Sequence, residues 1–246
     1  MEIWELMLMM QYLLPNPPVD MIAYHLLENN ALDSAGSYNG TGYGTSYDGQ
    51  SVNLTGASNS YITLGAGKTA FKVSTYSVSI WLKADTLPNA INMLVDNHYR
   101  GAGGGNTYNS GCRVGISNTG KLYGQYIVLN NESTTDSNGN TQSSYGPSCY
   151  SNTVIPTGTW AHVAYTVNGN EAALYVNGIL ESTVSSVQSI RYANLDDNYA
   201  LGILKYDSIV YYPFDGRLSH HRAYDRVLTS EEILNIYNYE KELFAA

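Results

Sequence analysis

The stretch Trp160–Glu181, WAHVAYTVNGNEAALYVNGILE, decides the fold class. It contains two Asn-Gly pairs, Asn168-Gly169 and Asn177-Gly178, and Asn-Gly is the dipeptide that best tolerates positive φ at two successive positions. Each pair therefore predicts a tight hairpin turn. Side chains around the turns alternate with the period of two that is typical of strands. The alternating sets are Val163, Tyr165 and Val167 against Ala164 and Thr166, and Ala172, Leu174 and Val176 against Ala173 and Tyr175. The stretch predicts a three-stranded antiparallel meander.

The composition agrees with an all-β protein, and a sandwich of 246 residues commonly forms one domain. Glycine and tyrosine occur 23 times each and charged residues make up 13%, which suits short strands joined by many turns better than long helices. The net charge is −9, and no cluster of Lys or Arg is present. A phosphate-neutralising surface is therefore not expected, and nucleic-acid binding is disfavoured.

The two cysteines, Cys112 and Cys149, allow either one disulfide bridge or two free thiols. A bridge would imply an oxidising environment. The sequence leaves both alternatives open.

Residues 1–14, MEIWELMLMMQYLL, form an apolar run that ends at a group of prolines. Glutamates stand where a signal peptide would carry basic residues, and the run is too short to span a membrane, so no membrane insertion is expected. We expect residues 1–18 to be an N-terminal extension that docks on a protein partner or a neighbouring copy. The alternative is a strand or helix that covers an edge of this chain's own sandwich. The docking side chains would be Ile3, Trp4, Leu6, Leu8, Leu13 and Leu14.

The C-terminal segment predicts a short helix that begins near Ser230. Thr229 and Glu232 have the spacing of a capping box, and Leu228 and Ile233 have that of a hydrophobic staple. The side chains expected to pack on the rest of the protein are Ile233, Ile236 and Tyr237.

Taken in order, the segments resemble the laminin-G-like jelly roll of the concanavalin A-like lectin/glucanase superfamily, in its pentraxin-related bacterial and phage form. The segments that carry the resemblance are YDGQ…NSYITL, YSVSIWLKA, TWAHVAYTVNGNEAALYVNGIL and FDGRLSHHRAYDRVLTSEEILNIY. The match spans about Val19 to Tyr239, with an inserted loop region at about 99–155 outside the usual pattern. The resemblance implies a jelly-roll domain over residues 19–246, an all-β sandwich of two antiparallel sheets with a short C-terminal helix. It does not by itself give a function.

An enzyme is not expected. Glycoside hydrolysis needs two carboxylates that flank the scissile bond, and the E-x-D-x-x-E string of the superfamily's glucanases is absent. Glu171 and Glu181 lie in the predicted meander, but the turn between them sets Glu181 opposite Leu174, so they do not form a pair. The resemblance makes His162 structural, and no nucleophile elbow accompanies His220-His221.

Calcium is the one cofactor that the resemblance suggests, because similar proteins often bind it at one rim of the sandwich. Calcium takes carboxylate, amide and carbonyl oxygens. The candidate metal ligands are Asp96, Asn97, Asp196 and Asp197. Asp and Asn are also ordinary turn residues, so both interpretations stay open.

Sugar binding would use aromatic rings together with polar side chains, and region 99–155 supplies both. The candidate ligand-binding residues are Tyr99, Tyr108, Tyr123, Tyr126, Tyr145 and Tyr150. Tyrosine is equally favoured in protein–protein contacts, or these rings pack on the sheets. Trp81 and Trp160 are expected in the core.

We therefore expect a non-catalytic recognition or display module on a virion surface or in the extracellular space. The first hypothesis is a phage virion protein (tail fibre, capsid decoration or head fibre) with a carbohydrate-binding, lectin-like jelly roll. Its partners would be a protein or further copies of the chain in a larger assembly, and a cell-surface glycan. The alternatives are a self-assembling structural subunit without a glycan ligand and a secreted bacterial carbohydrate-binding protein.

Overall fold

A computed structural model of the chain describes residues 16–65, 69–99, 110–128, 132–144, 146–190, 199–206 and 209–245. The side chains proposed for docking, from Ile3 to Leu14, lie outside these residues, so the docking of residues 1–18 stays a prediction.

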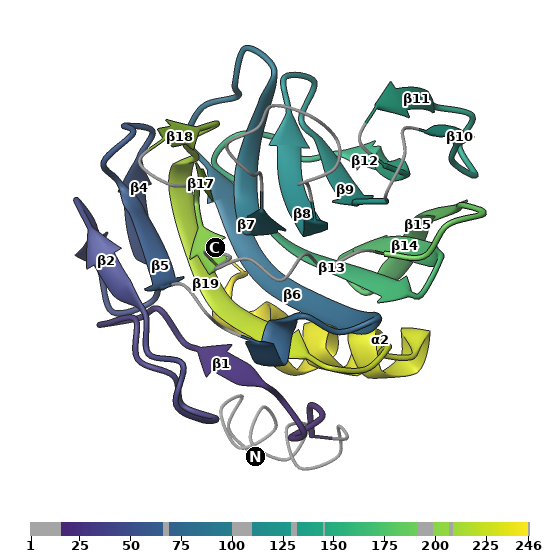
Figure 1. The fold of residues 1–246 in the computed structure, drawn as a ribbon. Coiled ribbons are helices and arrows are strands. Elements are labelled where there is room, and N and C mark those ends of the chain that lie inside the picture. Colours follow the sequence, from purple (N-terminus) through teal and green to yellow (C-terminus); the bar gives the residue numbers. More distant parts are fainter. Residues whose placement is uncertain are drawn as a thin grey trace.

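Two antiparallel sheets form the sandwich (Figure 1). The first sheet runs in the order β15 (Ile179–Ser185), β14 (Glu171–Val176), β13 (Trp160–Asn168), β6 (Thr75–Ala84), β19 (Asp215–Tyr224), β4 (Val52–Thr55) and β3 (Ser46–Tyr47), with β1 (Ala23–His25) also paired to β19. The second runs in the order β12 (Ser148–Val154), β9 (Lys121–Tyr126), β8 (Ser110–Ser117), β7 (Ile91–Tyr99), β16 (Tyr199–Leu201), β5 (Tyr61–Gly65) and β2 (Thr41–Tyr43). The predicted all-β sandwich is confirmed.

Two hairpins and three helical segments complete the described elements. The hairpins are β10 (Glu132–Thr135) with β11 (Thr141–Ser144), and β17 (Leu204–Tyr206) with β18 (Ile209–Tyr211). The helical segments are η1 (Thr69–Phe71), α2 (Ser230–Glu240) and η3 (Lys241–Leu243). No helix among the described residues is long and apolar enough to cross a membrane.

The predicted meander exists as β13, β14 and β15, but its two turns differ. Asn177 and Gly178 both have positive φ, 50° and 80°, as expected for a tight Asn-Gly turn. In the other turn Asn168 still belongs to β13 and pairs with Glu171. The turn is therefore shifted by one residue, and Gly169, with φ 63°, is its first central residue.

The sequence predicts Glu181 opposite Leu174, but this pairing is absent because β15 contains a β-bulge. Leu174 pairs with Ser182 and Tyr175 pairs with Leu180, so Glu181 is the extra residue between them. Its carboxylate accepts hydrogen bonds from the backbone N–H groups of Asn152 (2.8 Å) and Thr153 (3.0 Å). The bulge thereby ties the edge strand of the first sheet to β12, the edge strand of the second.

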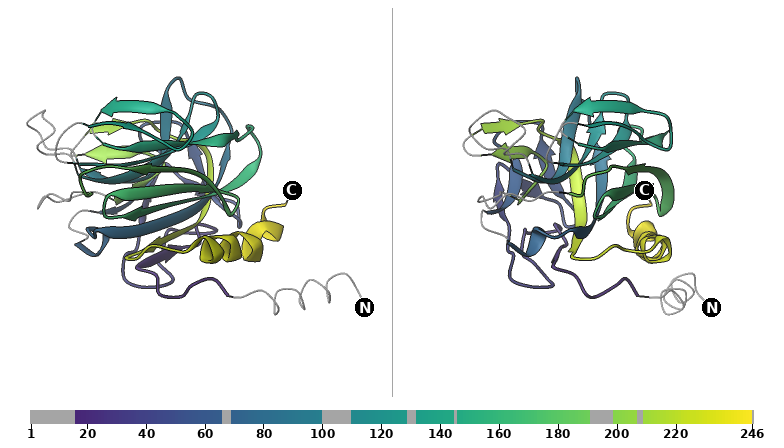
Figure 2. Two further views of the ribbon diagram at one scale, coloured as in Figure 1. Left: turned by 90° about the vertical axis from the view of Figure 1, so that its right-hand side faces the viewer. Right: turned by 45° about the vertical axis from the view of Figure 1, so that its right-hand side comes forward.

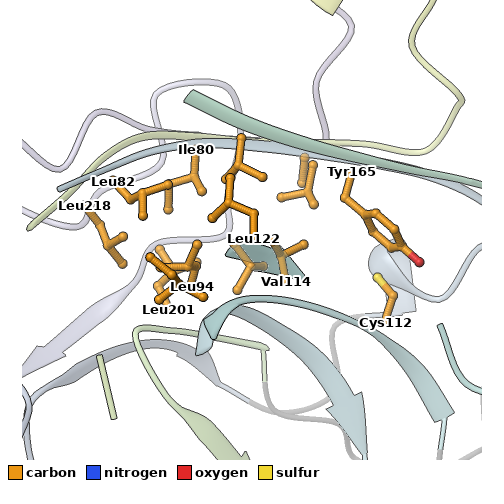
Figure 3. Close-up of a cluster of buried hydrophobic side chains, with 14 of the residues drawn as sticks. Ile80, Leu82, Leu94, Cys112, Val114, Leu122, Tyr165, Leu201 and Leu218 are labelled. Carbon is orange, nitrogen blue, oxygen red and sulfur yellow. The ribbon is translucent and has the colours of Figure 1, made fainter. Parts of the chain in front are cut away.

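The core lies between the inner faces of the two sheets (Figure 3). Side chains of the first sheet meet those of the second, and those labelled in the figure are Ile80, Leu82, Tyr165 and Leu218 against Leu94, Cys112, Val114, Leu122 and Leu201. Both cysteines are buried and no disulfide joins them, which decides the alternative that the sequence leaves open. Burial raises the pKa of Cys149 far above its usual value, so this thiol stays protonated at neutral pH.

Region 99–155 is not mainly an elaborated loop, contrary to the prediction. The strand pair visible in its sequence becomes β8 and β9, and both are interior strands of the second sheet. A further part of the region forms β12, the edge of that sheet. These segments form strands because apolar side chains alternate along them and are buried in the core, as for Val114, Ile116 and Leu122. Their burial offsets the loss of conformational entropy when the strands become ordered.

Helix α2 covers the outer face of the first sheet (Figure 2). The predicted capping box is present, because the Thr229 hydroxyl accepts from the Glu232 backbone and the Glu232 carboxylate accepts from the Thr229 backbone. Ile233 and Ile236 are fully buried as expected, and Tyr237 packs beside Trp81. The sequence pattern therefore fixes both the start and the buried face of this helix.

Candidate functional site

The outer face of the second sheet carries polar and aromatic side chains that the sandwich core does not use. Since Val114, Ile116 and Leu122 point into the core, alternation along β8 and β9 turns Ser117 and Tyr123 to the opposite face. This face differs from the outer face of the first sheet, which α2 covers.

A groove of about 470 Å³ opens at one end of this face, and we call it the polar groove. It is formed by the start of β7, the β8–β9 turn, β9, β12 and the β10–β11 hairpin. Its lining includes Ile91, Asn118, Thr119, Lys121, Asn140 and Tyr150. The described residues that line it supply amides, hydroxyls, one ammonium group and one phenol ring, and none of them is acidic.

Tyr150 gives the polar groove its aromatic surface. Its ring lies 5.1 Å from the ring of Tyr123, centroid to centroid, and Tyr123 in turn packs against Met93 and Leu204. Burial raises the pKa of Tyr150 to about 12, so its hydroxyl stays protonated at neutral pH. The ring is therefore backed by an apolar layer and held in position.

Asp136 fastens the β10–β11 hairpin to the sheet beside the groove. One carboxylate oxygen accepts from the backbone N–H groups of Asn138 (3.0 Å) and Asn140 (2.8 Å). The other accepts from the Tyr150 backbone N–H at 2.9 Å and from the Ser182 hydroxyl at 3.2 Å. Asn140 and Tyr150, on two sides of the groove, are thus positioned by the same buried carboxylate.

Of the predicted ligand-binding tyrosines whose side chains the structure describes, Tyr150 alone lines the groove. Tyr126 is fully buried, and its hydroxyl donates to the Asn170 carbonyl at 2.5 Å. Tyr123 is 3% exposed and serves as the backing layer described above. The prediction for these two residues is corrected, because their positions in β9 enclose both rings. Tyr99 ends β7 but its side chain is not described, and Tyr108 and Tyr145 lie outside the described residues.

The predicted calcium ligands that the structure describes are already engaged with the protein. Asp96 is buried, and one of its carboxylate oxygens accepts from the Lys205 backbone N–H at 3.1 Å. Asn97 is also buried and donates to the Phe71 carbonyl at 3.0 Å. No group of three or more His, Cys, Asp or Glu side chains within the described ranges is arranged to hold a metal ion. Asp196 and Asp197 lie outside those ranges, so calcium remains untested.

The structure also shows a second aromatic surface that the sequence analysis missed. Tyr43 of β2 and Tyr61 of β5 stack with ring centroids 4.9 Å apart beside a hollow of about 450 Å³ that Asn59 and Lys205 also line. The two tyrosines face each other because Tyr43 pairs with Tyr61 across the strands. Strand register of this kind is not readable from the short, polar segments that carry the two residues.

Residues 55–234 match the family model described as "Concanavalin A-like lectin/glucanases superfamily". The chain belongs to this superfamily. No curated protein matches the sequence of this superfamily member.

Several solved structures share the superfamily fold. Domain 4 of the arabinanase AbnA from Geobacillus stearothermophilus, in complex with arabinotriose, has a TM-score of 0.59 and 22% identity, covering 89% of this chain and 98% of that one. The ligand binding domain of botulinum neurotoxin serotype D, in complex with N-acetylneuraminic acid, has a TM-score of 0.62 and 19% identity over 89% of this chain and 51% of that one. Trypanosoma rangeli sialidase with sialic acid has a TM-score of 0.64 and 12% identity over 94% of this chain and 34% of that one.

This superfamily member thus spans nearly all of the arabinanase domain, about half of the neurotoxin chain and about a third of the sialidase chain. At these identities the likeness establishes the fold alone. The fold occurs both in chains named as binding domains and in a chain named as a sialidase.

Proposed function

We propose that the protein is a non-catalytic carbohydrate-binding module and that the polar groove holds the glycan. The observation that carries the proposal is the combination of the supported Tyr150 ring with amide and hydroxyl side chains in one open groove. An aromatic ring offers apolar surface to the C–H face of a sugar, and a few convergent polar groups fix the hydroxyls. The sugar ligands named for the arabinanase domain and the neurotoxin domain support the same class of ligand.

The absence of acidic side chains from the described groove lining supports binding rather than hydrolysis. Glycosidases place two carboxyl groups about 5–10 Å apart across the scissile bond. Glu171 is an exposed residue at the end of a strand, and the Glu181 carboxylate accepts a hydrogen bond from the backbone of β12. Neither carboxylate lines the groove.

A glycan array tests this proposal, followed by titration of each hit. We expect saturable binding that Tyr150→Ala weakens by about tenfold or more, or about 1.4 kcal/mol, while Tyr150→Phe keeps the ring and most of the affinity. Lys121→Ala removes the ammonium group of the groove and should also weaken binding. Lys83→Ala, on the other sheet, is its matched control. A blank array, or a hit whose affinity is unchanged by Tyr150→Ala and Lys121→Ala, would contradict the proposal. Parallel arrays with calcium and with EDTA test whether calcium, the cofactor that the resemblance suggests, takes part in binding.

A second candidate is a self-assembling structural subunit, which the edge strand β15 favours. Ile179 and Leu180 at its start are 58% and 49% exposed, although both are large and apolar. Light scattering after size exclusion should then show a defined oligomer that Ile179→Lys dissociates. A monomer at high concentration would contradict this candidate.

We further propose, from the sequence, that the module is displayed on a phage virion and is attached through residues 1–18. Deletion of these residues should abolish incorporation into particles and leave the sandwich folded. Normal incorporation of the truncated chain would contradict the attachment.

A further inference from the structure

We propose that the polar groove and a neighbouring depression form one continuous channel for a linear, uncharged polysaccharide, rather than a pocket for a terminal sugar. This inference rests on the proposed carbohydrate binding and adds the class of ligand.

The second depression has a volume of about 500 Å³, and we call it the rim hollow. Ala90 and Ile91 line both the polar groove and the rim hollow, so the two depressions adjoin at the start of β7. Either depression alone lies in the lower half of the range of roughly 300–1,000 Å³ that holds small ligands, and together they approach its upper end. Two adjoining depressions of this combined size suit a ligand of several sugar units.

Each depression contains one tyrosine in its lining, Tyr150 in the polar groove and Tyr212 in the rim hollow. Amide side chains occur in both, with Asn118 and Asn140 in the groove and Asn89 in the hollow. A chain of sugar rings presents an apolar face and a set of hydroxyls at each unit. Two rings with accompanying amides match that repetition, whereas a terminal sugar needs only one such set.

Tyr212 of the rim hollow has a backbone conformation that is rare for a bulky residue. Its φ is +56°, in the left-handed region that bulky residues avoid, and it precedes Pro213, which restricts it further. Such a conformation costs about 1–3 kcal/mol and is found mainly at functional sites. The Tyr212 carbonyl accepts from the Met93 backbone N–H at 2.9 Å, while the side chain remains 42% exposed. This segment thus combines an uncommon backbone conformation with an exposed aromatic side chain that lines the rim hollow.

The charges of the channel exclude a polyanion as the preferred ligand. Lys121 lines the polar groove and Asp215 lines the rim hollow. A polysaccharide with a carboxylate on each unit would gain at Lys121 and be repelled at Asp215. An uncharged chain meets both groups as hydrogen-bonding partners.

The test measures affinity against chain length by calorimetry. The probes are arabino-, xylo-, malto- and cello-oligosaccharides of three and six units, with oligogalacturonates of the same lengths as the charged comparison. For one neutral series we expect the hexasaccharide to bind about tenfold or more tighter than the trisaccharide. Tyr212→Ala should remove most of this gain, and Tyr212→Phe should retain it. Leu32→Ala, which shortens an exposed apolar side chain outside the channel and outside the Tyr43–Tyr61 surface, is the control.

Equal affinity for three and six units, no effect of Tyr212→Ala on the hexasaccharide, or tighter binding of the oligogalacturonates would overturn the channel while leaving the proposed function in place. Failure of every probe together with a blank glycan array would overturn both. Circular dichroism of each variant separates loss of binding from loss of fold.

Discussion

Nδ1 of His25 lies 3.1 Å from Nδ1 of His221 inside the sandwich, so one proton is shared between two buried rings. Nε2 of His25 lies 2.9 Å from the Tyr38 carbonyl and must donate to it, which makes Nδ1 of His25 the acceptor. His221 then donates from Nδ1, and its Nε2 accepts from the Tyr199 hydroxyl at 2.8 Å. The Tyr76 hydroxyl lies 2.7 Å from that of Tyr199 and continues the chain. Both imidazoles are neutral in this arrangement.

We predict that the protein loses stability as the pH falls below about 6.5, the ordinary pKa of histidine. Burial lowers the pKa of His25 and lowers that of His221 further, although Asp33 acts on His25 in the opposite direction. Below pH 6.5 the two histidines are therefore protonated in the unfolded chain but remain neutral in the folded one. The free energy of unfolding consequently decreases as the pH falls. Urea denaturation at pH 7.5, 6.5 and 5.5 measures the decrease.

The variant His25→Gln provides the control for this titration. Its amide can donate to the Tyr38 carbonyl and accept from His221, and it does not titrate. We expect a smaller dependence on pH between 7.5 and 5.5. A wild-type protein whose midpoint is unchanged over this range would refute the neutral pair.

We predict that His162→Phe stabilises the protein by about 1–2 kcal/mol at neutral pH. His162 is fully buried, and within the described part of the chain neither ring nitrogen has a hydrogen-bond partner. Burial lowers the pKa of His162 to about 4, so the unfolded chain takes up a proton here before the folded one does, and the free energy of unfolding decreases as the pH falls from 6.5 towards 4. The advantage of phenylalanine should therefore grow between pH 6.5 and pH 4. Destabilisation at both pH 7 and pH 5 would show that the histidine has an essential contact.

We predict that Glu240→Ala destabilises the protein by about 3–5 kcal/mol, because it leaves the buried Arg222 without its ion-pair partner. Glu240 also accepts from the Trp81 indole at 2.8 Å and lies 3.1 Å from Nδ1 of His220. Burial alone raises the pKa of Glu240, but Arg222 and His220 outweigh it and lower the pKa to about 2. The stabilisation is therefore present above about pH 4.5 and is lost as the pH falls towards 2.

Glu231→Ala is the matched control for this change, since Glu231 is an exposed glutamate of the same helix. We expect it to alter the free energy of unfolding by less than about 0.5 kcal/mol. Equal effects of the two variants in urea denaturation would contradict the role assigned to Glu240.

Local patterns predicted the elements whose formation is local. The Asn177-Gly178 turn, the capping box at Thr229 and the buried Trp81 each follow from side chains close in sequence or from strand alternation. The bulge at Glu181 and the shifted turn at Gly169 did not follow, because register depends on pairing with another strand. Tyr126 looked like a ligand-binding residue for the same reason: the sequence shows that β9 is a strand, but not which sheet encloses it. The polar groove is lined by residues from β7, β9, β11 and β12. These strands are distant in sequence, and no pattern within any one of them predicts that they lie side by side.

The turn at Gly178 lies directly against Leu234 of α2. Gly178 has φ 80°, and a Cβ at this position would lie 2.8 Å from Cδ1 and 3.1 Å from Cα of Leu234. Gly178→Ala therefore combines backbone strain with a clash against the helix. Gly158→Ala is the matched control, because Gly158 has a similar φ of 74° and a Cβ there would meet no atom within 4 Å. We expect a loss of about 1 kcal/mol for Gly158→Ala and a clearly larger loss, about 2–4 kcal/mol, for Gly178→Ala. Equal losses in urea denaturation would mean that α2 moves away from the turn at little cost, and that the helix is only loosely packed on the meander.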